Sequence, residues 1–302
     1  MHEQFGHRDA AMKPPSFDYA VADSVESAVS HLREAGEDAK LLAGGQSLVP
    51  LMNFRLARPS LLVDVNRIPR LSDIVVDDDF VRIGALTRHH RLETSSTIAK
   101  HIPLLREAAG WIAHPQIRNR GTIGGSLAHA DASAELPVVL LALDATVTVK
   151  SPDHDRHLAV GDLAVGHLVS SLNPDEMIVN VEVPRLPART GCAFTEFARR
   201  HGDYAVGGAA SVLTFDEAGI CTRARITVLG GGATATRRDE AEAALVGTSV
   251  TSSDAQTAGH LASADLEPMP TLHGGSEYRR HIITAMVCRA VNTAASRARS
   301  TL

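Results

Sequence analysis

The stretch Arg118-Asn119-Arg120-Gly121-Thr122-Ile123-Gly124-Gly125-Ser126, which continues through Leu127-Ala128-His129-Ala130-Asp131, decides the fold. An apolar run from Leu136 to Leu143 follows it and predicts a helix. A glycine-rich turn ahead of a helix allows backbone N–H groups to approach an anion closely, because no side chain stands in the way. We therefore predict that this turn binds a phosphate or diphosphate.

A second stretch, Leu41-Leu42-Ala43-Gly44-Gly45-Gln46-Ser47, has the same design: an apolar strand, a Gly-Gly turn and two polar residues. One such turn alone usually indicates only a tight turn. Two of them, each between regular elements, favour one ligand whose two phosphates are held from both sides.

Composition excludes several classes of protein. The chain has 302 residues, 44% hydrophobic and 22% charged, as in globular proteins of two or three domains. A net charge of -5 gives no support for a nucleic-acid partner. We expect no membrane span, because no apolar run is long enough.

The cysteines predict a reducing environment. Cys192, Cys221 and Cys288 are scattered and odd in number, which is typical of a cytoplasmic protein. Without a Cys-x-x-Cys motif, neither an iron–sulfur cluster nor a structural zinc is expected in this chain. The histidine pairs His89-His90 and His154/His157 are interpreted as solvated surface, so no metal site is expected.

The pattern along the chain predicts three parts. Residues 1–11 are patternless and are expected to be a disordered extension. Residues 12–187 form a cofactor-binding domain with lobes at about 12–66 and 67–187. Pro184 and Pro187 mark its end.

Periodicity predicts most elements. In the first lobe we expect a helix from a capping box at Asp23 and Glu26 to Gly36, a strand at 41–43, a helix at 48–56 and a strand at 61–65. In the second lobe we expect a hairpin at 74–86, helices within 88–111 and strands at 146–149 and 177–183. Beyond residue 187 we expect antiparallel strands at 194–198, 208–215 and 220–229, and helices at 238–246, 254–262 and 278–297.

These motifs, in this order, closely resemble the FAD-binding medium subunit of molybdenum hydroxylases, the family of aerobic carbon monoxide dehydrogenase and xanthine dehydrogenase. The resemblance covers nearly the whole chain from Met12. Besides both glycine turns it rests on Glu135-Leu136-Pro137, on Arg200-His201-Gly202-Asp203-Tyr204-Ala205 and on Gly274-Gly275-Ser276-Glu277-Tyr278-Arg279. It implies an α+β fold: a two-lobed FAD-binding domain of the PCMH type, then a C-terminal domain at 188–302 with an antiparallel sheet and helices.

The resemblance also implies which residues contact non-covalently bound FAD. Backbone amides of the two glycine turns would hold the diphosphate and ribityl region, with hydroxyls of Thr122 and Ser126 adding hydrogen bonds. The implied contacts are Leu42, Ala43, Gly44, Gly45, Gln46, Ser47, Ile117, Thr122, Ile123, Gly124, Gly125, Ser126, Asp131, Glu135, Ile178 and Tyr204.

Several of these residues have a purely structural alternative. Glu135 suits the first turn of a helix whether or not a cofactor is near. Tyr204 could stack on the isoalloxazine or be a core tyrosine. Ile117 could equally contact the flavin or the core, whereas Ile178 matches an apolar position that packs on the cofactor in relatives.

At three positions the sequence departs from the family pattern, and each departure limits what the resemblance implies. Ala132-Ser133 replaces Pro-Ala after Asp131, which should loosen that turn. Gln46 stands where carbon monoxide dehydrogenases tend to have histidine, so carbon monoxide is a doubtful substrate. Glu196 occupies a place where some relatives carry a flavin-facing lysine, so no lysine role is assigned there.

The function implied is that of an electron relay with no catalytic residues of its own. A large subunit would carry the molybdenum cofactor, a small one two [2Fe–2S] clusters, and the complex would be a dimer of heterotrimers. FAD would pass electrons to an external acceptor. Two alternatives stay open: a self-sufficient FAD-dependent oxidoreductase with its own substrate pocket, and a scaffold subunit without flavin.

Overall fold

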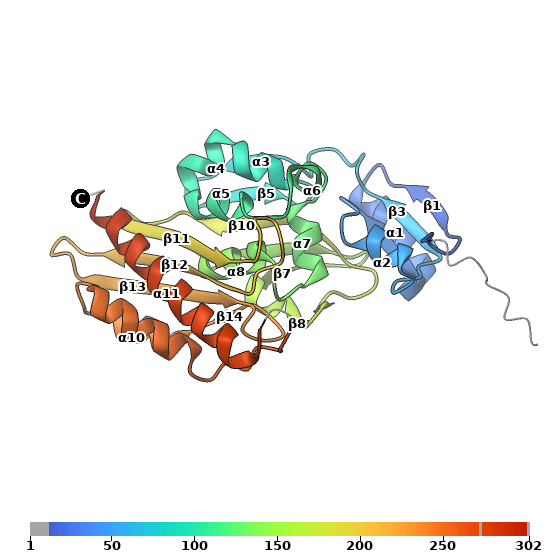
Figure 1. Ribbon diagram of the computed structural model, residues 1–302. Coiled ribbons are helices and arrows are strands. Elements are labelled where there is room, and N and C mark those ends of the chain that lie inside the picture. Colours follow the sequence, from blue (N-terminus) through green and yellow to red (C-terminus); the bar gives the residue numbers. More distant parts are fainter. Residues whose placement is uncertain (1–11, 272–273, 301–302) are drawn as a thin grey trace, which may run out of the picture.

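A small parallel sheet organises the first lobe of the computed structural model, which describes residues 12–271 and 274–300; the predicted extension at 1–11 lies outside them. Strands β1 (Asp18–Val21), β2 (Ala39–Leu42) and β3 (Leu61–Asp64) pair in the order β1-β3-β2. Helices α1 (Val25–Ala35) and α2 (Leu48–Asn53) and the short helix η1 (Gly36–Asp38) connect them. Figure 1 shows this lobe set to one side of the rest.

The structure confirms the predicted end of helix α1 but not its predicted N-terminal cap. Gly36 ends the helix as expected, with φ +61°. The expected capping box at Asp23 and Glu26 is wrong, because the N-cap is Ser24, whose hydroxyl accepts a hydrogen bond from the Ser27 N–H at 3.1 Å.

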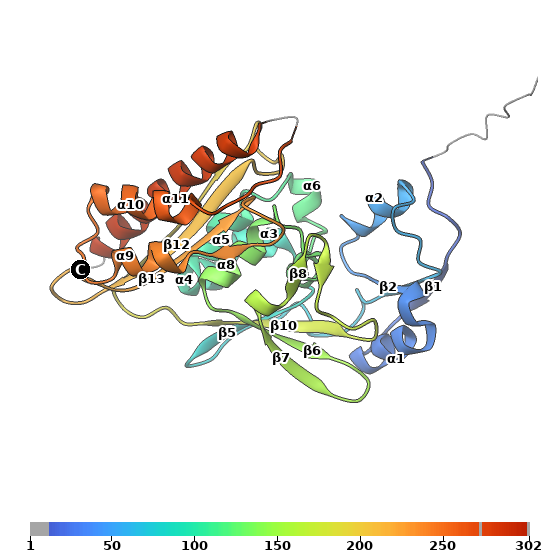
Figure 2. The ribbon, with the colours of Figure 1, turned by 90° about the horizontal axis from the view of Figure 1, so that it is seen from below.

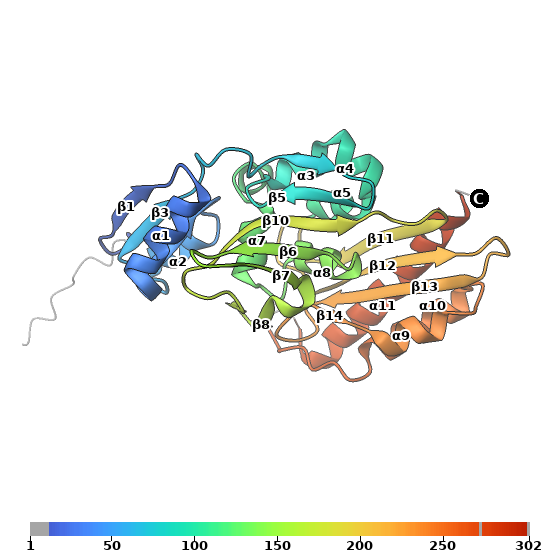
Figure 3. The same ribbon diagram turned by 180° about the vertical axis from the view of Figure 1, so that it is seen from behind.

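An antiparallel five-stranded sheet forms the second lobe. Its order is β4-β5-β10-β6-β7, and its strands are β4 (Ile74–Val76), β5 (Phe80–Gly84), β6 (Thr146–Lys150), β7 (Asp155–Ala159) and β10 (Met177–Pro184). Strand β7 was not predicted: His157 lies in this strand rather than in a turn, and its side chain is exposed, as expected, while it contacts the Thr148 hydroxyl at 3.2 Å. Figure 3 shows this sheet from behind.

Short helices link the strands of this lobe. They are α3 (His89–Thr94), α4 (Ser96–His101), α5 (Pro103–Ala109), α6 (Pro115–Arg118), α7 (Ile123–His129) and α8 (Glu135–Ala142), with η2 (Val160–Asp162) and the hairpin β8 (Ala164–Gly166) and β9 (Val169–Ser170) after β7. Pro103 and Pro115 open their helices, where a missing N–H costs nothing.

The C-terminal part is a second antiparallel sheet covered by helices. Strands β11 (Thr190–Phe197), β12 (Gly207–Phe215), β13 (Cys221–Leu229) and β14 (Thr236–Arg237) pair in chain order. Helices α9 (Asp239–Leu245), α10 (Ser252–Ser263) and α11 (Ser276–Arg299) cover one face (Figure 2). Among the residues 12–271 and 274–300, no helix could cross a membrane.

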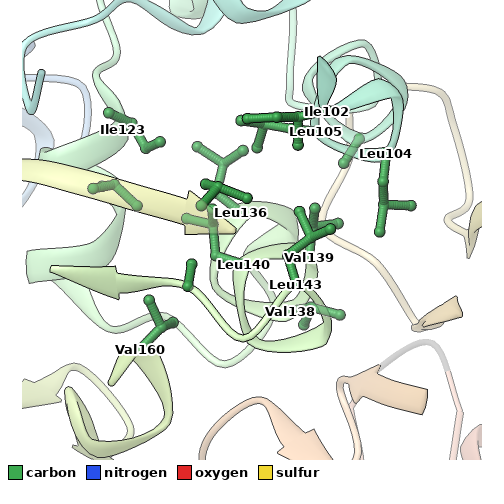
Figure 4. Packing of buried hydrophobic residues seen from close by; sticks show 14 of the residues in the cluster. Ile102, Leu104, Leu105, Ile123, Leu136, Val138, Val139, Leu140, Leu143 and Val160 are labelled. Atoms are coloured by element: carbon green, nitrogen blue, oxygen red, sulfur yellow. The ribbon is translucent and has the colours of Figure 1, made fainter. Parts of the chain in front are cut away.

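One hydrophobic core joins the second lobe to the C-terminal sheet. Helices α5 and α8 lie between the two sheets, and α8 is apolar on all sides because it is buried on all sides. Figure 4 shows Leu136, Val139 and Leu140 of α8 beside Ile102, Leu104 and Leu105. The same cluster takes in Cys192, Phe194 and Val212 of the C-terminal sheet. The second glycine turn, which leads into α7, is therefore attached to a rigid two-sheet body through Ile123.

The contact between β11 and α11 leaves no room for a side chain at Gly191. A Cβ atom there would lie 2.5 Å from the Ala298 nitrogen, whereas a Cβ at Gly232 would meet no heavy atom within 4 Å. We expect Gly191→Ala to destabilise the fold by about 1–3 kcal/mol, because β11 must move off the helix. Thermal unfolding of the variant, with Gly232→Ala as the matched control, measures this; equal melting temperatures would contradict it.

Candidate functional site

The main candidate site is a cavity of about 820 Å³ between the first lobe and the rest of the molecule. This volume is within the range of small-molecule and cofactor pockets. Residues of both glycine turns line it, as do residues of α1, β2, β10 and the segment 202–204. In Figure 2, α2 of the first lobe faces α6 and β8 of the second.

The two glycine turns touch each other. A Cβ atom on Gly44 would overlap the Arg120 carbonyl group and lie 2.9 Å from the Gly121 Cα. Only glycine allows this approach of one backbone to the other. The two turns, about 80 residues apart in sequence, thus form one continuous wall of the cavity.

A hydrogen-bonded brace fixes the two turns behind this contact. The Asn66 amide nitrogen donates to the carbonyl oxygens of Leu42 at 3.2 Å and Ala43 at 2.9 Å, beside the first turn. Arg88 donates to the Asn66 side-chain oxygen at 2.6 Å and, through its other terminal nitrogen, to the Arg120 carbonyl oxygen in the second turn. The brace also places a guanidinium charge behind the junction, which favours an anion in front of it.

The first turn presents free backbone donors. In the part of the chain that the structure describes, no hydrogen bond uses the N–H groups of Gly44, Gly45, Gln46 and Ser47. Gly45 has φ +71°, and the Gln46 side chain donates to the Gly44 carbonyl oxygen at 2.9 Å, so the turn is held in shape from within. Four consecutive unpaired amides at the edge of a cavity form an anion-binding concavity.

The backbone N–H groups of the second turn were predicted to be free for a ligand, but they already make hydrogen bonds within the protein. The N–H groups of Ile123 and Gly124 donate to the carbonyl oxygens of Thr87 at 3.1 Å and Ala85 at 2.9 Å. Those of Gly125 and Ser126 donate to the Thr122 hydroxyl at 3.2 Å and its carbonyl oxygen at 3.0 Å. These bonds anchor and cap α7, so its first-turn amides already have partners.

The glycines of the second turn serve packing as well as access. A Cβ on Gly124 would lie 2.6 Å from the Ala85 Cβ, so this glycine allows α7 to contact the chain just after β5. Gly125 is exposed to the cavity, and the nearest heavy atom to a Cβ there is the Thr122 hydroxyl at 2.8 Å. Gly125 is therefore the glycine of this turn whose bare surface faces the cavity.

All the predicted contacts line the cavity except Leu42 and Ile123. Leu42 packs beneath the first turn, where its Cδ1 lies 3.2 Å from the place of a Gly45 Cβ. Ile123 is fully buried in the core below α7. Both residues support the turns from behind.

The side chains predicted to contact the cofactor differ in how far they are exposed. Tyr204 is 74% exposed, so it is not a core tyrosine. Ile117 is half-buried, and Ile178 is buried while still lining the cavity. The turn after Asp131 is held despite the Ala132-Ser133 replacement, because the Ser133 N–H donates to the Asp131 carboxylate at 2.8 Å.

Two carboxyl groups with raised pKa values, the half-buried Glu135 and the buried Glu196, lie at this end of the molecule. Glu135 is the first residue of α8 and also lines the cavity; burial, with the charge of Asp131 adding, raises its pKa to about 7. Glu196 on β11 is 8% exposed, and neither of its oxygens has a hydrogen-bond partner among the described residues. Burial and then the charge of Glu135 raise the pKa of Glu196 to about 8.

Sequence reasoning missed several residues of the cavity. His89 is buried rather than solvated; the residue is part of the cavity lining, and its ring packs beside Gly121. Lys40 and Glu37 after α1, together with Leu172, Asn173, Pro174, Glu176 and Met177, line another part. No motif marks these positions, because the contacts form only when the first lobe folds against β10. Among the described residues, no group of His, Cys, Asp and Glu could hold a metal ion.

The buried Glu196 predicts a pH-dependent stability. Its folded pKa of about 8 lies above the ordinary 4.5, so the native state keeps a proton that the unfolded chain loses. Stability should therefore fall as the pH rises from about 4.5 to 8. Glu196→Gln removes this loss and should stabilise the chain by roughly 2–4 kcal/mol more at pH 8.5 than at pH 5. Unfolding at both pH values measures it.

The matched control for this test is Glu217→Gln, since the Glu217 side chain is 85% exposed and pairs only at the surface with Arg189. If Glu196→Gln and the wild-type chain changed stability with pH in the same way, Glu196 would not be protonated in the folded state.

Comparison with known proteins places the chain in a family. Residues 15–186 match the FAD binding domain in molybdopterin dehydrogenase, and residues 192–294 match the CO dehydrogenase flavoprotein C-terminal domain. The 6-hydroxypseudooxynicotine dehydrogenase complex subunit alpha of Paenarthrobacter nicotinovorans is 61% identical, over 96% of this chain and 98% of that protein. The carbon monoxide dehydrogenase medium chain of Hydrogenophaga pseudoflava is 37% identical, over 95% of this chain and 99% of that protein.

Solved structures agree with this placement. The carbon monoxide dehydrogenase of Hydrogenophaga pseudoflava that lacks the Mo-pyranopterin moiety contains a chain with a TM-score of 0.91 and 39% identity, over 94% of this chain and 99% of that one. Quinoline 2-oxidoreductase from Pseudomonas putida 86 contains a chain with a TM-score of 0.89 and 38% identity, over 94% of this chain and 98% of that one. The chain belongs to the FAD-binding medium subunits of the molybdenum hydroxylases.

Proposed function

We propose that this chain is the FAD-carrying electron-transfer subunit of a heterotrimeric molybdenum hydroxylase. The observation that supports it most is the wall of two touching glycine turns, where four residues that line a cavity of cofactor size have backbone amides unpaired among the described residues. A pyrophosphate bridge needs several donors at short range, and main-chain amides supply them without a side chain in the way.

The residues present suit FAD. The amides of Gly44 to Ser47 would bind the diphosphate, and the hydroxyls of Thr122 and Ser126 would add to them. Asp131 and Glu135 would accept from ribose or ribityl hydroxyls. Ile117, Ile178 and Tyr204 would contact the isoalloxazine, and Ala43, Gly124 and Gly125 would supply bare surface for close approach.

When bound, FAD would supply the redox chemistry, taking electrons from the [2Fe–2S] clusters of a partner subunit and passing them to an external acceptor. This chain's own residues would bind and orient the cofactor, and no residue is assigned a catalytic role. The proposed limits are 12–187 for the FAD-binding domain and 188–302 for the C-terminal domain.

Partners would supply the other centres. Relatives are named as a medium chain or as one subunit of a dehydrogenase complex, which supports a large and a small partner. We extend this to a dimer of heterotrimers in the cytoplasm, in keeping with three unpaired cysteines. Because a relative with 61% identity belongs to a 6-hydroxypseudooxynicotine dehydrogenase complex, that compound is the first substrate to test.

The two alternatives have less support. A self-sufficient flavoenzyme is disfavoured because the relatives are named as subunits of complexes. A scaffold without flavin would have no use for four unpaired amides at a cavity.

The first test removes the bare surface of the second turn. Gly125→Val places a branched side chain in the cavity and should weaken FAD binding at least tenfold, which is about 1.4 kcal/mol. The flavin content of the purified chain and a titration of the apo chain with FAD measure the effect. Gly124→Val is a poorer test, because a side chain there meets Ala85 and disturbs packing.

Gly232→Val is the matched control, since a Cβ at that position has open space. A folded Gly125→Val variant with the flavin content of the wild type would remove the second turn from the binding site.

The second test concerns the division of labour. With FAD bound but without the large and small subunits, the chain should show no flavin reduction by 6-hydroxypseudooxynicotine. Reduction should appear when both partners are added, because they carry the molybdenum and iron–sulfur centres. Anaerobic absorbance spectroscopy follows the flavin; bleaching in the isolated chain would favour the self-sufficient enzyme instead.

A further inference from the structure

A group of ion pairs around Arg33 joins the first lobe to the second. The Arg33 guanidinium on α1 donates to both carboxylate oxygens of Asp153, at 2.9 and 2.6 Å, and to the Asp175 carboxylate at 3.1 Å. Asp153 lies in the turn between β6 and β7, and Asp175 lies just before β10. Figure 2 and Figure 3 both show the turn between β6 and β7 beside α1. One cation thus connects the first lobe to two separate segments of the second.

These ion pairs lie beside residues that line the cavity. Leu32, the residue before Arg33, lines the cavity from the first lobe. Pro174 and Glu176, the residues on either side of Asp175, line it from the second lobe. Arg33 itself is not among the described residues that line the cavity. It therefore acts on the walls of the cavity and not on what the cavity holds.

One of the two connected segments is a strap, residues 171–176, that links β9 to β10 and belongs to neither strand. Arg156 fixes its ends, because it donates to the Ser171 carbonyl oxygen at 2.9 Å and to the Glu176 carboxylate at 2.7 and 2.6 Å. The Glu176 carboxylate also accepts a hydrogen bond from the Asn173 N–H at 2.7 Å. Side-chain contacts rather than strand pairing therefore hold the strap in place.

The geometry around Arg33 is of the kind that makes a partly exposed ion pair effective. Isolated surface pairs contribute little, but bidentate arginine–carboxylate pairs and networks of several charges are exceptions. Both features are present here. The Arg33 side chain is 43% exposed, so water replaces its partners readily when the contacts break. The contact is thus strong enough to hold two segments together and weak enough to open repeatedly.

We propose that Arg33 is a positioning residue for the cofactor: a latch that ties the first lobe to the strap and to the turn between β6 and β7, and so sets how fast FAD enters and leaves the cavity. The inference rests on the proposed function and deepens it, because it assigns what controls cofactor exchange at that site. All partners of the latch belong to this chain, so it forms with FAD and without it. Breaking the latch therefore speeds loading and release alike and leaves the equilibrium affinity nearly unchanged.

Loading of the full apo chain with FAD, and release of FAD from the loaded chain after dilution, test the latch; flavin fluorescence follows both. Arg33→Gln should make both rates roughly two- to tenfold faster, because it removes two partly exposed ion pairs, and should leave the dissociation constant close to that of the wild type. In 1 M salt the screening length falls to about 3 Å, so the two chains should then exchange FAD at similar rates. Arg33→Gln combined with Asp153→Asn should be no faster than Arg33→Gln alone, because the first change already removes the pair.

The matched control is Arg189→Gln, since Arg189 is also partly exposed and pairs with Glu217 at 3.0 Å, and neither residue lines the cavity. It should exchange FAD as the wild type does. Wild-type rates of loading and release in Arg33→Gln would overturn the latch and leave the proposed function intact. A higher dissociation constant without faster loading would also overturn it, because Arg33 would then act on the cofactor itself. A wild-type chain that binds no FAD would overturn the proposed function and the latch together.

Discussion

The contact between the two glycine turns is the constraint on which the site depends. Gly44 lies against the backbone of Arg120 and Gly121 with no space for a side chain, and Asn66 and Arg88 tie the turns together from behind. The first turn belongs to a small three-stranded lobe, and the second is anchored to the two-sheet body through Thr87 and Ala85. The wall of the cavity is therefore also a junction between the lobes.

The two turns have unequal roles that their similar sequences conceal. The second turn uses its amides to cap and anchor α7, which makes it a rigid support. The first turn leaves four amides unpaired and is the one whose donors are available to an anion. A cofactor bound there would satisfy groups that otherwise have only water, and would contact both sides of the lobe junction.

Much of this fold could be predicted from the sequence because the signals are local. The strand–turn–helix pattern at 41–53, the apolar helix α8 and the alternating strands β12 and β13 each carry their own periodicity. The site was less predictable, since Asn66, Arg88 and His89 carry no local signature and come together only through tertiary contacts. The state of the amides of Ile123 and Gly124 also depends on carbonyl groups nearly 40 residues earlier in the chain. Buried acids such as Glu196 could not be recognised, because burial of a strand end depends on the neighbouring sheet.

Hydrogen–deuterium exchange of the backbone amides, with and without FAD, tests the central claim most directly. Unpaired amides exchange quickly and become slow when a ligand accepts their hydrogen bonds. The account predicts that residues 44–47 exchange quickly in the apo chain and slowly with FAD, while Gly124 and Ser126 are slow in both states. Protection by FAD that appeared at 123–126 and left residues 44–47 unchanged would contradict it.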